Sequence, residues 1–380
     1  MLATKSKKLS SERIQIELQS LGMRMPFREM ASGRKGGAGP TDHKAVFIDG
    51  NTIMVPVHNE ASSTSPFWIG SPNELGVSRL YREDEEITSI SFPKQPKFYK
   101  HTTSDGVPMW KVAQLHSHNV LATTVLQNCV RYYDKSTSCQ FCAIGESLKA
   151  ERTIAYKRPH HLAEVAKLAV EKDGVEQFII TTGTPSTSDR GAKILHESVI
   201  AIKEAVDLAI QVQCEPPDNF DWFQKLKDAG ADAIGMHLEA VEESVRHRIM
   251  PGKAEVSVAY YMKAFEAAVE VFGKGNVSTY ILAGLGDSQE SILAMSEKLI
   301  GMGVYPFVVP FVPVSGTPLA TAPSPDQNFM ESLLTPISKM LVEAGITSDT
   351  LKAGCAKCGA CSVLKSLEKK HLKEITPYVV

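Results

Sequence analysis

The sequence predicts an α/β fold: a partial (β/α)6 barrel, with a small β-rich domain before it and a cysteine-rich extension after it. From residue 119 onward, short apolar runs typical of buried parallel strands alternate with amphipathic helical segments. Counting the strand before the first cysteines, this alternation gives six βα units. The chain has 380 residues, too many for one small core, so a barrel with added domains is expected.

Residues 1–115 are expected to form the small β-rich domain. The Asp49-Gly50 pair inside an alternating apolar run is a hairpin signal. The Gly-rich segment Met30 to Thr41 predicts a connector or, less strongly, a phosphate or substrate loop without the Walker spacing. The expected elements are a helix over Ser11 to Leu21, a hairpin over Ala45 to Val57, and strands over Ile87 to Phe92 and Met109 to Leu115.

Residues 116–322 are expected to form the barrel. Chemistry in such barrels lies at the carboxyl ends of the strands, and polar or glycine-containing segments follow most of the strands here. The expected strands are Leu121 to Leu126, Gln177 to Thr182, Ile210 to Cys214, Ala233 to Glu239, Val277 to Ala283 and Tyr305 to Pro313. The expected helices are His160 to Glu171, Ala192 to Leu208, Asp221 to Ala229, Val256 to Phe272 and Ser288 to Met302.

The composition is that of an ordinary soluble protein, with 43% apolar residues, 22% charged residues and a formal net charge of −2. Nothing is basic enough to indicate a nucleic-acid partner. The longest apolar stretch, Phe307 to Val314, is too short to span a bilayer. The charged N-terminus lacks the apolar core of a signal peptide, and the clustered cysteines suit a reducing compartment, so a cytoplasmic location is expected.

Cys129, Cys139 and Cys142 are the feature around which the rest of the chain is organised. Nine residues separate the first pair and two separate the second. Three thiolates so close can hold a metal or an iron–sulfur cluster, and a cubane cluster held by three cysteines keeps one open iron. The alternative is a zinc site, since CxxC is a common half of such sites, but no partner pair stands at a suitable nearby spacing.

The segment from Cys139 to Cys142, with Phe141 before the last cysteine, resembles the cluster loop of radical S-adenosylmethionine (SAM) enzymes. The usual loop has three residues between its first two cysteines, so the gap of nine is a departure. The resemblance covers residues 110–362 and is nearest to the biotin and lipoyl synthase branch. It implies a [4Fe-4S] cluster, SAM bound at the open iron, and hydrogen abstraction from a small metabolite by a 5′-deoxyadenosyl radical.

The resemblance also assigns side chains to SAM. The implied contacts are Phe141 and Gly284 near the adenine, Thr182 and Gly183 at the methionyl amino group, Glu239 at the ribose or amino group, and Arg246 at the carboxylate. The family usually has Gly-Gly-Glu-type residues where this chain has threonines. The simpler alternative is that the glycines only end strands and that Arg246 lies on a solvated helix face.

Residues 323–380 are expected to add a helix over Pro325 to Ala344 and a CxxCxxC motif, which is formed by Cys355, Cys358 and Cys361. This spacing indicates a metal or cluster site, interpreted here as an auxiliary iron–sulfur cluster.

Two alternatives for this motif stay open, a zinc site and an exposed, reducible tail. Cys214 or His371 would be the fourth ligand of a zinc ion. Ser362 is a candidate fourth cluster ligand by analogy with lipoyl synthase.

The sequence therefore predicts an oxygen-sensitive radical SAM enzyme, with flavodoxin or ferredoxin as its electron donor. Sulfur insertion is the first subtype, because a second cluster could supply the sulfur. Radical rearrangement or oxidation of an amino-acid-like substrate in nitrile metabolism is the alternative, because phrases such as QCEPPD and KAGCAKCGACS resemble a bacterial radical SAM family of nitrilase gene clusters. A zinc-stabilised binding protein is the hypothesis from another class.

Overall fold

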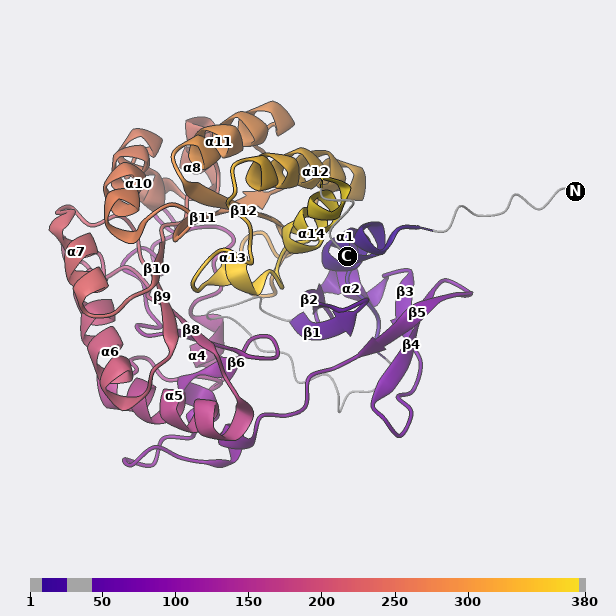
Figure 1. Cartoon of the computed structure of the whole chain (residues 1–380), viewed down its shortest axis with the longest axis horizontal. Coiled ribbons are helices and arrows are strands. Elements are labelled where there is room, and N and C mark those ends of the chain that lie inside the picture. Colours follow the sequence, from indigo (N-terminus) through magenta and orange to yellow (C-terminus); the bar gives the residue numbers. More distant parts are fainter. Residues whose placement is uncertain (1–8, 26–42, 376–380) are drawn as a thin grey trace, which may run out of the picture.

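The computed structural model describes residues 9–25 and 43–375 (Figure 1). The segment Met30 to Thr41, expected to be a connector or a phosphate loop, lies outside the described residues. The described chain forms a seven-stranded sheet of order β12-β11-β10-β9-β8-β7-β6 and a five-stranded sheet of order β2-β1-β5-β4-β3. Figure 1 shows the larger sheet with helices along its outer side and the smaller sheet beside it.

The larger sheet confirms the expected partial (β/α)6 barrel. Six parallel strands follow one another in sequence order, and β6 adds an antiparallel edge. Because β6 and β12 are the two edges of the sheet, the barrel is open between them. The strands are β6 (Gln114–Leu115), β7 (Val120–Thr124), β8 (Gln177–Thr181), β9 (Ala209–Gln213), β10 (Ala233–Gly235), β11 (Val277–Ala283) and β12 (Val304–Pro310).

Local signals set the ends of the helices around this sheet. Ser257 and Ser288 cap α10 and α11 by accepting a backbone N–H through their side chains, and Gly174 ends α5 in the left-handed conformation. The helices are α4 (Glu146–Lys149), α5 (Pro159–Asp173), α6 (Ala192–Ala205), α7 (Asp221–Asp228), α8 (Glu243–Ile249), α9 (Pro251–Ala254), α10 (Val258–Phe272) and α11 (Gln289–Gly301).

The smaller sheet has an apolar core of its own, to which α1 contributes Ile14 and Leu18. The hairpin at Asp49-Gly50 is confirmed, and both residues have the positive φ that a tight hairpin turn needs. The elements are α1 (Ser11–Leu21), β1 (His43–Ile48), β2 (Asn51–Pro56), α2 (Glu60–Ser63), β3 (Phe67–Ile69), β4 (Val77–Arg82) and β5 (Glu85–Ser91).

Two expectations for this region are corrected. The sequence analysis missed β3 and β4, whose alternation is short. The strand expected over Met109 to Leu115 is wrong for its first half, because the chain forms helix α3 (Met109–Val112) after Pro108 and continues as β6. A short 3-10 helix, η2 (Lys97–Lys100), precedes it.

The C-terminal part contains α12 (Gln327–Glu343), α13 (Cys355–Cys358) and α14 (Leu364–Ile375). Asp326 caps α12, so the helix begins two residues after the expected start at Pro325. Backbone bonding joins this part to the smaller sheet, since the Met54 N–H donates to the Ala360 carbonyl over 2.7 Å. We propose that the chain divides near residues 115 and 322, because the first sheet has a separate core. At the first boundary, β6 already belongs to the larger sheet.

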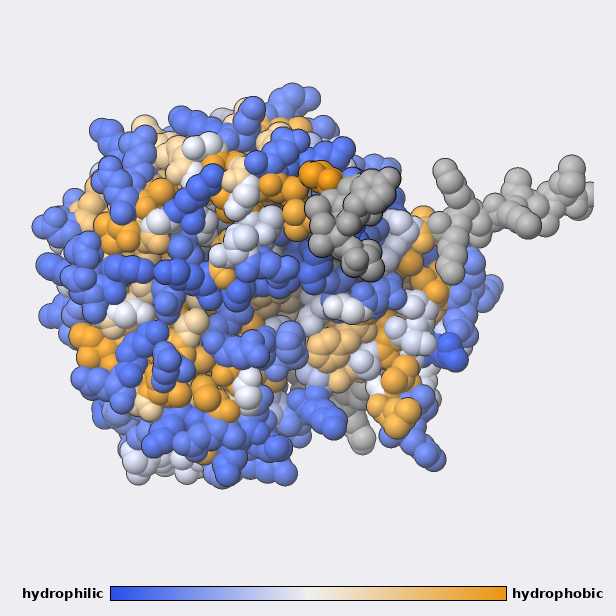
Figure 2. All heavy atoms as spheres, viewed as in Figure 1, coloured by the Kyte–Doolittle hydropathy of each residue, from blue (hydrophilic) through white to orange (hydrophobic). Residues whose placement is uncertain are grey.

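The face shown in Figure 2 is mostly hydrophilic, with apolar residues in scattered groups. Among the described residues, no helix combines the length and the apolar character needed to cross a bilayer.

Candidate active site at the carboxyl ends of the barrel strands

The CxxC half of the first cysteine loop is held between α8 and the segment that follows β12. The Gln140 N–H donates to the Ile249 carbonyl (2.9 Å), and the Gln140 side chain donates to the Arg248 carbonyl (2.6 Å). The Gln140 carbonyl in turn accepts the Leu319 N–H (3.2 Å). Segments far apart in the sequence thus fix the backbone around Cys139.

The Cys129 half of the loop is held by the end of β8. The Val130 N–H donates to the Thr184 carbonyl (2.8 Å), and the Gly183 N–H donates to the Leu126 carbonyl (2.9 Å). A Cβ atom on Gly183 would lie 1.9 Å from the Asn128 carbonyl oxygen, far inside van der Waals contact. Only glycine therefore allows the end of β8 to come this close to the loop.

Gly183→Ala is expected to push the loop away from β8 and to cost about 1–3 kcal/mol of stability through overpacking. Because Asn128 directly precedes Cys129, the variant should also bind less iron at the first triplet. Gly301→Ala is the matched control, since nothing lies within 4 Å of a Cβ there. Thermal unfolding and iron content measure the two effects, and equal behaviour of the two variants would contradict the steric argument.

Two thiols of the loop, those of Cys139 and Cys142, lie in surroundings that do not stabilise a bare thiolate. Burial raises the pKa of Cys142 to about 11 and raises the pKa of Cys139 well above its usual range. Neighbouring thiols and carboxylates add to this effect for both residues. Thiolates here need a bound cation to be stable at neutral pH, and iron or another metal supplies one.

The spacing of the sulfurs argues against a single zinc ion at either cysteine triplet. Sulfurs on one tetrahedral zinc lie about 3.8 Å apart, given a Zn–S bond of about 2.3 Å. Among the described residues, which include all seven cysteines, the one group of three ligand atoms that all lie within 4.8 Å of one another is formed by Asp105, His160 and His161. A cluster, which spreads its thiolates over several irons, tolerates the wider spacing.

The Asp105 group has a structural role. The Arg158 N–H donates to His161 Nδ1 (3.1 Å), so in the neutral ring Nε2 carries the proton and donates it to Asp105 (2.8 Å). Nε2 therefore has no free lone pair for a metal. The arrangement instead ties the turn around Asp105 to the first turn of α5.

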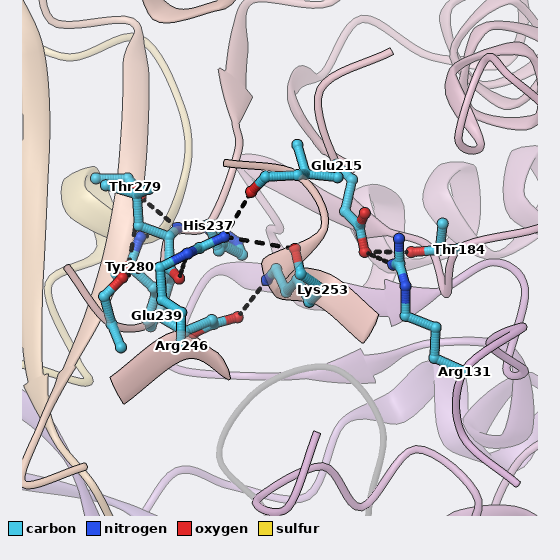
Figure 3. Close-up of polar contacts among 12 residues, drawn as sticks. Arg131, Thr184, Glu215, His237, Glu239, Arg246, Lys253, Thr279 and Tyr280 are labelled. Atoms are coloured by element: carbon cyan, nitrogen blue, oxygen red, sulfur yellow. Dashed lines mark hydrogen bonds and ion pairs between the residues drawn. The ribbon is translucent and has the colours of Figure 1, made fainter. Parts of the chain in front are cut away.

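Charged side chains that act on the thiols of the first triplet form two groups, both drawn in Figure 3. In one group, Glu215 at the end of β9 is paired with Arg131 and also accepts the Thr184 hydroxyl (2.8 Å). In the other group, the Lys253 ammonium donates to Glu239 (3.1 Å). Burial disfavours the charged form of this lysine, but Glu239 and Glu215 together raise its pKa. Glu239 has φ +65, an uncommon conformation for a residue other than glycine, and such backbones gather at functional sites.

The second triplet lies inside the barrel. Cys355 and Cys358 pack against Val120, Ala122 and Ile179 on the inner side of β7 and β8. Figure 1 shows α13 beside the strands rather than outside the helical layer. The expected helix and CxxCxxC motif thus do not form an exposed tail.

Inward-facing glutamines hold this segment in place. The Gly354 N–H donates to the Gln177 side chain (2.8 Å), and the Cys355 N–H donates to the Gln211 side chain (3.1 Å). The Gln213 side-chain amide donates to Cys355 Sγ (3.2 Å). Polar residues in a barrel interior need partners, and the cysteine-rich segment supplies them.

Each sulfur of the second triplet has a polar neighbour. His116 Nε2 lies 3.4 Å from Cys361 Sγ, and Ser117 Oγ lies 3.6 Å from Cys358 Sγ. Burial raises the pKa of the Cys355 and Cys361 thiols, and the Tyr280 side chain, which lines the same cavity, opposes this effect. Hydrogen bonds to ligating sulfur tune cluster potentials, so this environment suits an iron–sulfur cluster.

The fourth ligands considered for this triplet do not fit. The Ser362 hydroxyl donates to the Val308 carbonyl (2.6 Å), and His371 Nδ1 pairs with the Ser338 hydroxyl (3.0 Å). Cys214 is buried at the end of β9, where the charges acting on its thiol are those of Glu215 and Asp189. The sequence pattern does not predict which elements enclose these side chains, because this depends on packing between distant segments.

A cavity of about 300 Å³, called here the cavity between the triplets, is lined by residues from both cysteine-containing segments. Phe141 of the first loop lines it, together with Cys355 and Cys361 of the second triplet. His237 and Glu239 from the end of β10 complete its polar wall. Burial lowers the pKa of His237 to about 4, so this ring is neutral, and its Nδ1 accepts the Tyr280 N–H (3.2 Å).

Comparison with known protein families matches residues 135–299 to the radical SAM superfamily. The chain therefore contains a radical SAM domain. This confirms the resemblance drawn from the cysteine loop, and the family implies a [4Fe-4S] cluster and SAM as cofactors. The finer resemblance to a family of nitrilase gene clusters stays a prediction.

Two curated proteins are similar to this radical SAM chain. It is 27% identical over 212 residues to bacteriochlorophyllide c C-7(1)-hydroxylase of Chlorobaculum limnaeum, covering 51% of the chain and 52% of that protein. It is 29% identical over 242 residues to biotin synthase 2 of Paracoccus denitrificans (strain Pd 1222), covering 59% of this chain and 71% of that protein. The chain thus spans about half of the length of the first relative.

Solved structures with a similar fold include methylornithine synthase (PylB), with a TM-score of 0.44 at 17% identity. That alignment covers 57% of this chain and 61% of the other.

The charged groups near the first triplet fit SAM. Oε2 of Glu215 is buried and has no hydrogen-bond partner among the described residues, although Oε1 is paired. An orphaned carboxylate oxygen is costly, and the α-ammonium group of SAM would satisfy it. Glu215 is not among the expected SAM contacts, although its position directly after a barrel strand is a usable signal.

Glu215→Gln is expected to weaken SAM binding about tenfold to a hundredfold, because a charged hydrogen bond becomes a neutral one. Equilibrium dialysis against labelled SAM measures this change. Glu243→Gln on α8 is the control, since that carboxylate is exposed and accepts the Val258 N–H at the start of α10. Equal affinities of the two variants would remove Glu215 from the proposed site.

The residues assigned to SAM from the sequence lie in different surroundings. Phe141 packs beside Leu319 and lines the cavity, as Glu239 does. Thr182 and Gly183 lie at the end of β8, where Thr182 donates its N–H to the Gln213 carbonyl (3.2 Å). Their roles stay proposals.

Gly284 and Arg246 differ most from expectation. Gly284 ends β11 with φ +109, and a Cβ there would meet Pro325 at 3.2 Å. Arg246 is fully buried, and its guanidinium donates to the carbonyls of Leu238 (2.6 Å) and Val256 (2.9 Å). This arrangement does not fit the expected pairing of Arg246 with the SAM carboxylate; the side chain instead joins α8 to the end of β10.

Proposed function

We propose that this protein is a radical SAM enzyme with two iron–sulfur clusters that replaces hydrogen by sulfur on an unactivated carbon of a small metabolite. Cys129, Cys139 and Cys142 would hold the [4Fe-4S] cluster that binds SAM. The Cys355 triplet would hold the second cluster. When bound, these groups supply a 5′-deoxyadenosyl radical on one side and sulfide on the other.

The cavity between the triplets is the observation that carries the proposal. A substrate there would have the first loop on one side and the sulfurs of Cys355 and Cys361 on the other. The apolar wall, which includes Leu282, Val309 and Phe311, would exclude water from a reactive carbon radical. The names of the two curated relatives, a hydroxylase and a biotin synthase, support oxidative substitution at carbon.

The test is anaerobic reconstitution followed by analysis of iron, sulfide and 5′-deoxyadenosine. Two clusters predict about eight irons per chain. Addition of SAM should perturb the electron paramagnetic resonance signal of the reduced protein, and dithionite or reduced flavodoxin should yield 5′-deoxyadenosine. Zinc in place of iron would overturn the proposal and favour a zinc-stabilised binding protein. Iron of about four per chain would keep SAM cleavage but remove the reason for preferring sulfur insertion.

A further inference from the structure

A cavity of about 660 Å³ lies where the smaller sheet meets the open edge of the barrel. It is formed by the start of β1, the segment after β5, and the region of α3 and β6. We call it the cationic cleft. Its lining residues are His43, Lys44, Ala45, Met54, Phe92, Pro93, Lys94, Gln95, Pro96, Tyr99, Trp110, Gln114, Leu115, His116, Ser117, Ala122 and Arg152.

The charge of the cleft has one sign. Lys44, Lys94 and Arg152 line it, and no aspartate or glutamate is among its described lining residues. The whole chain has 41 basic and 43 acidic residues, so this excess is local. A cleft with one sign of charge concentrates ions of the opposite sign.

The charge of Lys44 is not neutralised by an ion pair with any described residue. The residue is half-buried, and burial lowers the pKa of its ammonium group. Within residues 9–25 and 43–375, no carboxylate lies within ion-pair distance of it. A desolvated ammonium without a partner is unfavourable, and a bound anion would relieve that cost.

The remaining walls suit the apolar body of an organic anion. Phe92, Tyr99 and Trp110 line the cleft, and the Arg152 guanidinium lies over the Trp110 ring at 5.8 Å from its centroid. Stacking in this way holds the guanidinium in place beside the cleft. A cavity of this size has room for a small metabolite.

The cleft adjoins the cavity between the two triplets. His43, Met54, His116 and Ala122 line both spaces. Because His116 also lies 3.4 Å from Cys361 Sγ, a ligand held by the cations can extend toward the second triplet.

We propose that the cationic cleft binds the anionic end of the substrate, a carboxylate or a phosphate, with Lys44 and Arg152 as its counterions. The apolar part of the molecule then reaches into the cavity between the triplets. That the bound anion is the substrate rests on the proposed function, whereas the selectivity of the cleft for anions does not.

The test uses quenching of Trp110 fluorescence in the reconstituted protein, without SAM or reductant. Subtracting the signal of a Trp110→Phe variant removes the contributions of Trp68 and Trp222. Iodide is expected to quench Trp110 about tenfold more strongly than caesium does. This preference should be largely lost in Lys44→Gln/Arg152→Gln and kept in Lys44→Arg.

Lys97→Gln/Lys100→Gln is the matched control, because it removes two charges next to the cleft from residues that do not line it. Iron content and thermal unfolding show that each variant is folded. Equal quenching of the wild type by iodide and caesium would overturn the proposal, as would an equal loss of preference in the control.

Competition identifies the anion. Butyrate or inorganic phosphate should protect Trp110 from iodide, whereas neutral butyramide should not; the stronger protector shows whether the cleft prefers carboxylate or phosphate. Protection by butyramide, or by none of the three, counts against the site. If the cleft selects anions but SAM is not cleaved, the anion site is supported and the proposed function is contradicted.

Discussion

Replacing Cys139 by alanine is expected to abolish 5′-deoxyadenosine formation and to lower iron from about eight to about four per chain. In the proposed function the residue supplies one of three ligands in the first loop, and its buried thiol lies near the charges of Lys253 and Glu239. Two remaining cysteines cannot hold three irons of a cubane. Iron analysis and chromatography of the reaction mixture measure both effects.

Cys214→Ala is the control for this variant. Cys214 is also a buried cysteine at a strand end, but it belongs to neither triplet. The control should keep about eight irons and most of the SAM cleavage. An equal loss of iron in the control would mean that any core thiol affects assembly, and would contradict the specific assignment of Cys139.

Replacing Cys355, Cys358 and Cys361 together by alanine is expected to remove about four irons while the first cluster remains. SAM should still perturb the remaining resonance signal and should still be cleaved slowly. Formation of a sulfur-containing product should fall below detection, because the sulfur source is absent. A triple variant that still forms such a product would rule out the second cluster as the donor.

Because the CxxCxxC segment is buried in the barrel, replacing its three cysteines is also expected to affect folding. Ser362→Ala tests that separately: the hydroxyl binds a β12 carbonyl close to the triplet and is not a ligand in our assignment. Its variant should lose about 1 kcal/mol of stability but no iron. Loss of iron in Ser362→Ala would restore serine as a fourth ligand.

The sequence by itself determined the class of fold and the cysteine motifs. Strand and helix periods are local properties, so six βα units could be counted along the chain, and the Asp49-Gly50 turn could be placed. The spacing of Cys139 and Cys142 likewise expresses ligand chemistry within a few residues. The matched radical SAM family agrees with both.

Only the tertiary structure decided where these motifs face. Whether CxxCxxC was a tail or part of the barrel interior depended on contacts such as Gln211 with Cys355, 144 residues apart. Arg246 and Glu215 show the same limit. The first is surrounded by backbone carbonyls and the second keeps an unpaired oxygen, and both facts arise from packing between elements distant in sequence. Whether a side chain is buried, and which groups it pairs with, depends on all of its neighbours in space at once. Periodicity and spacing along the sequence do not encode this.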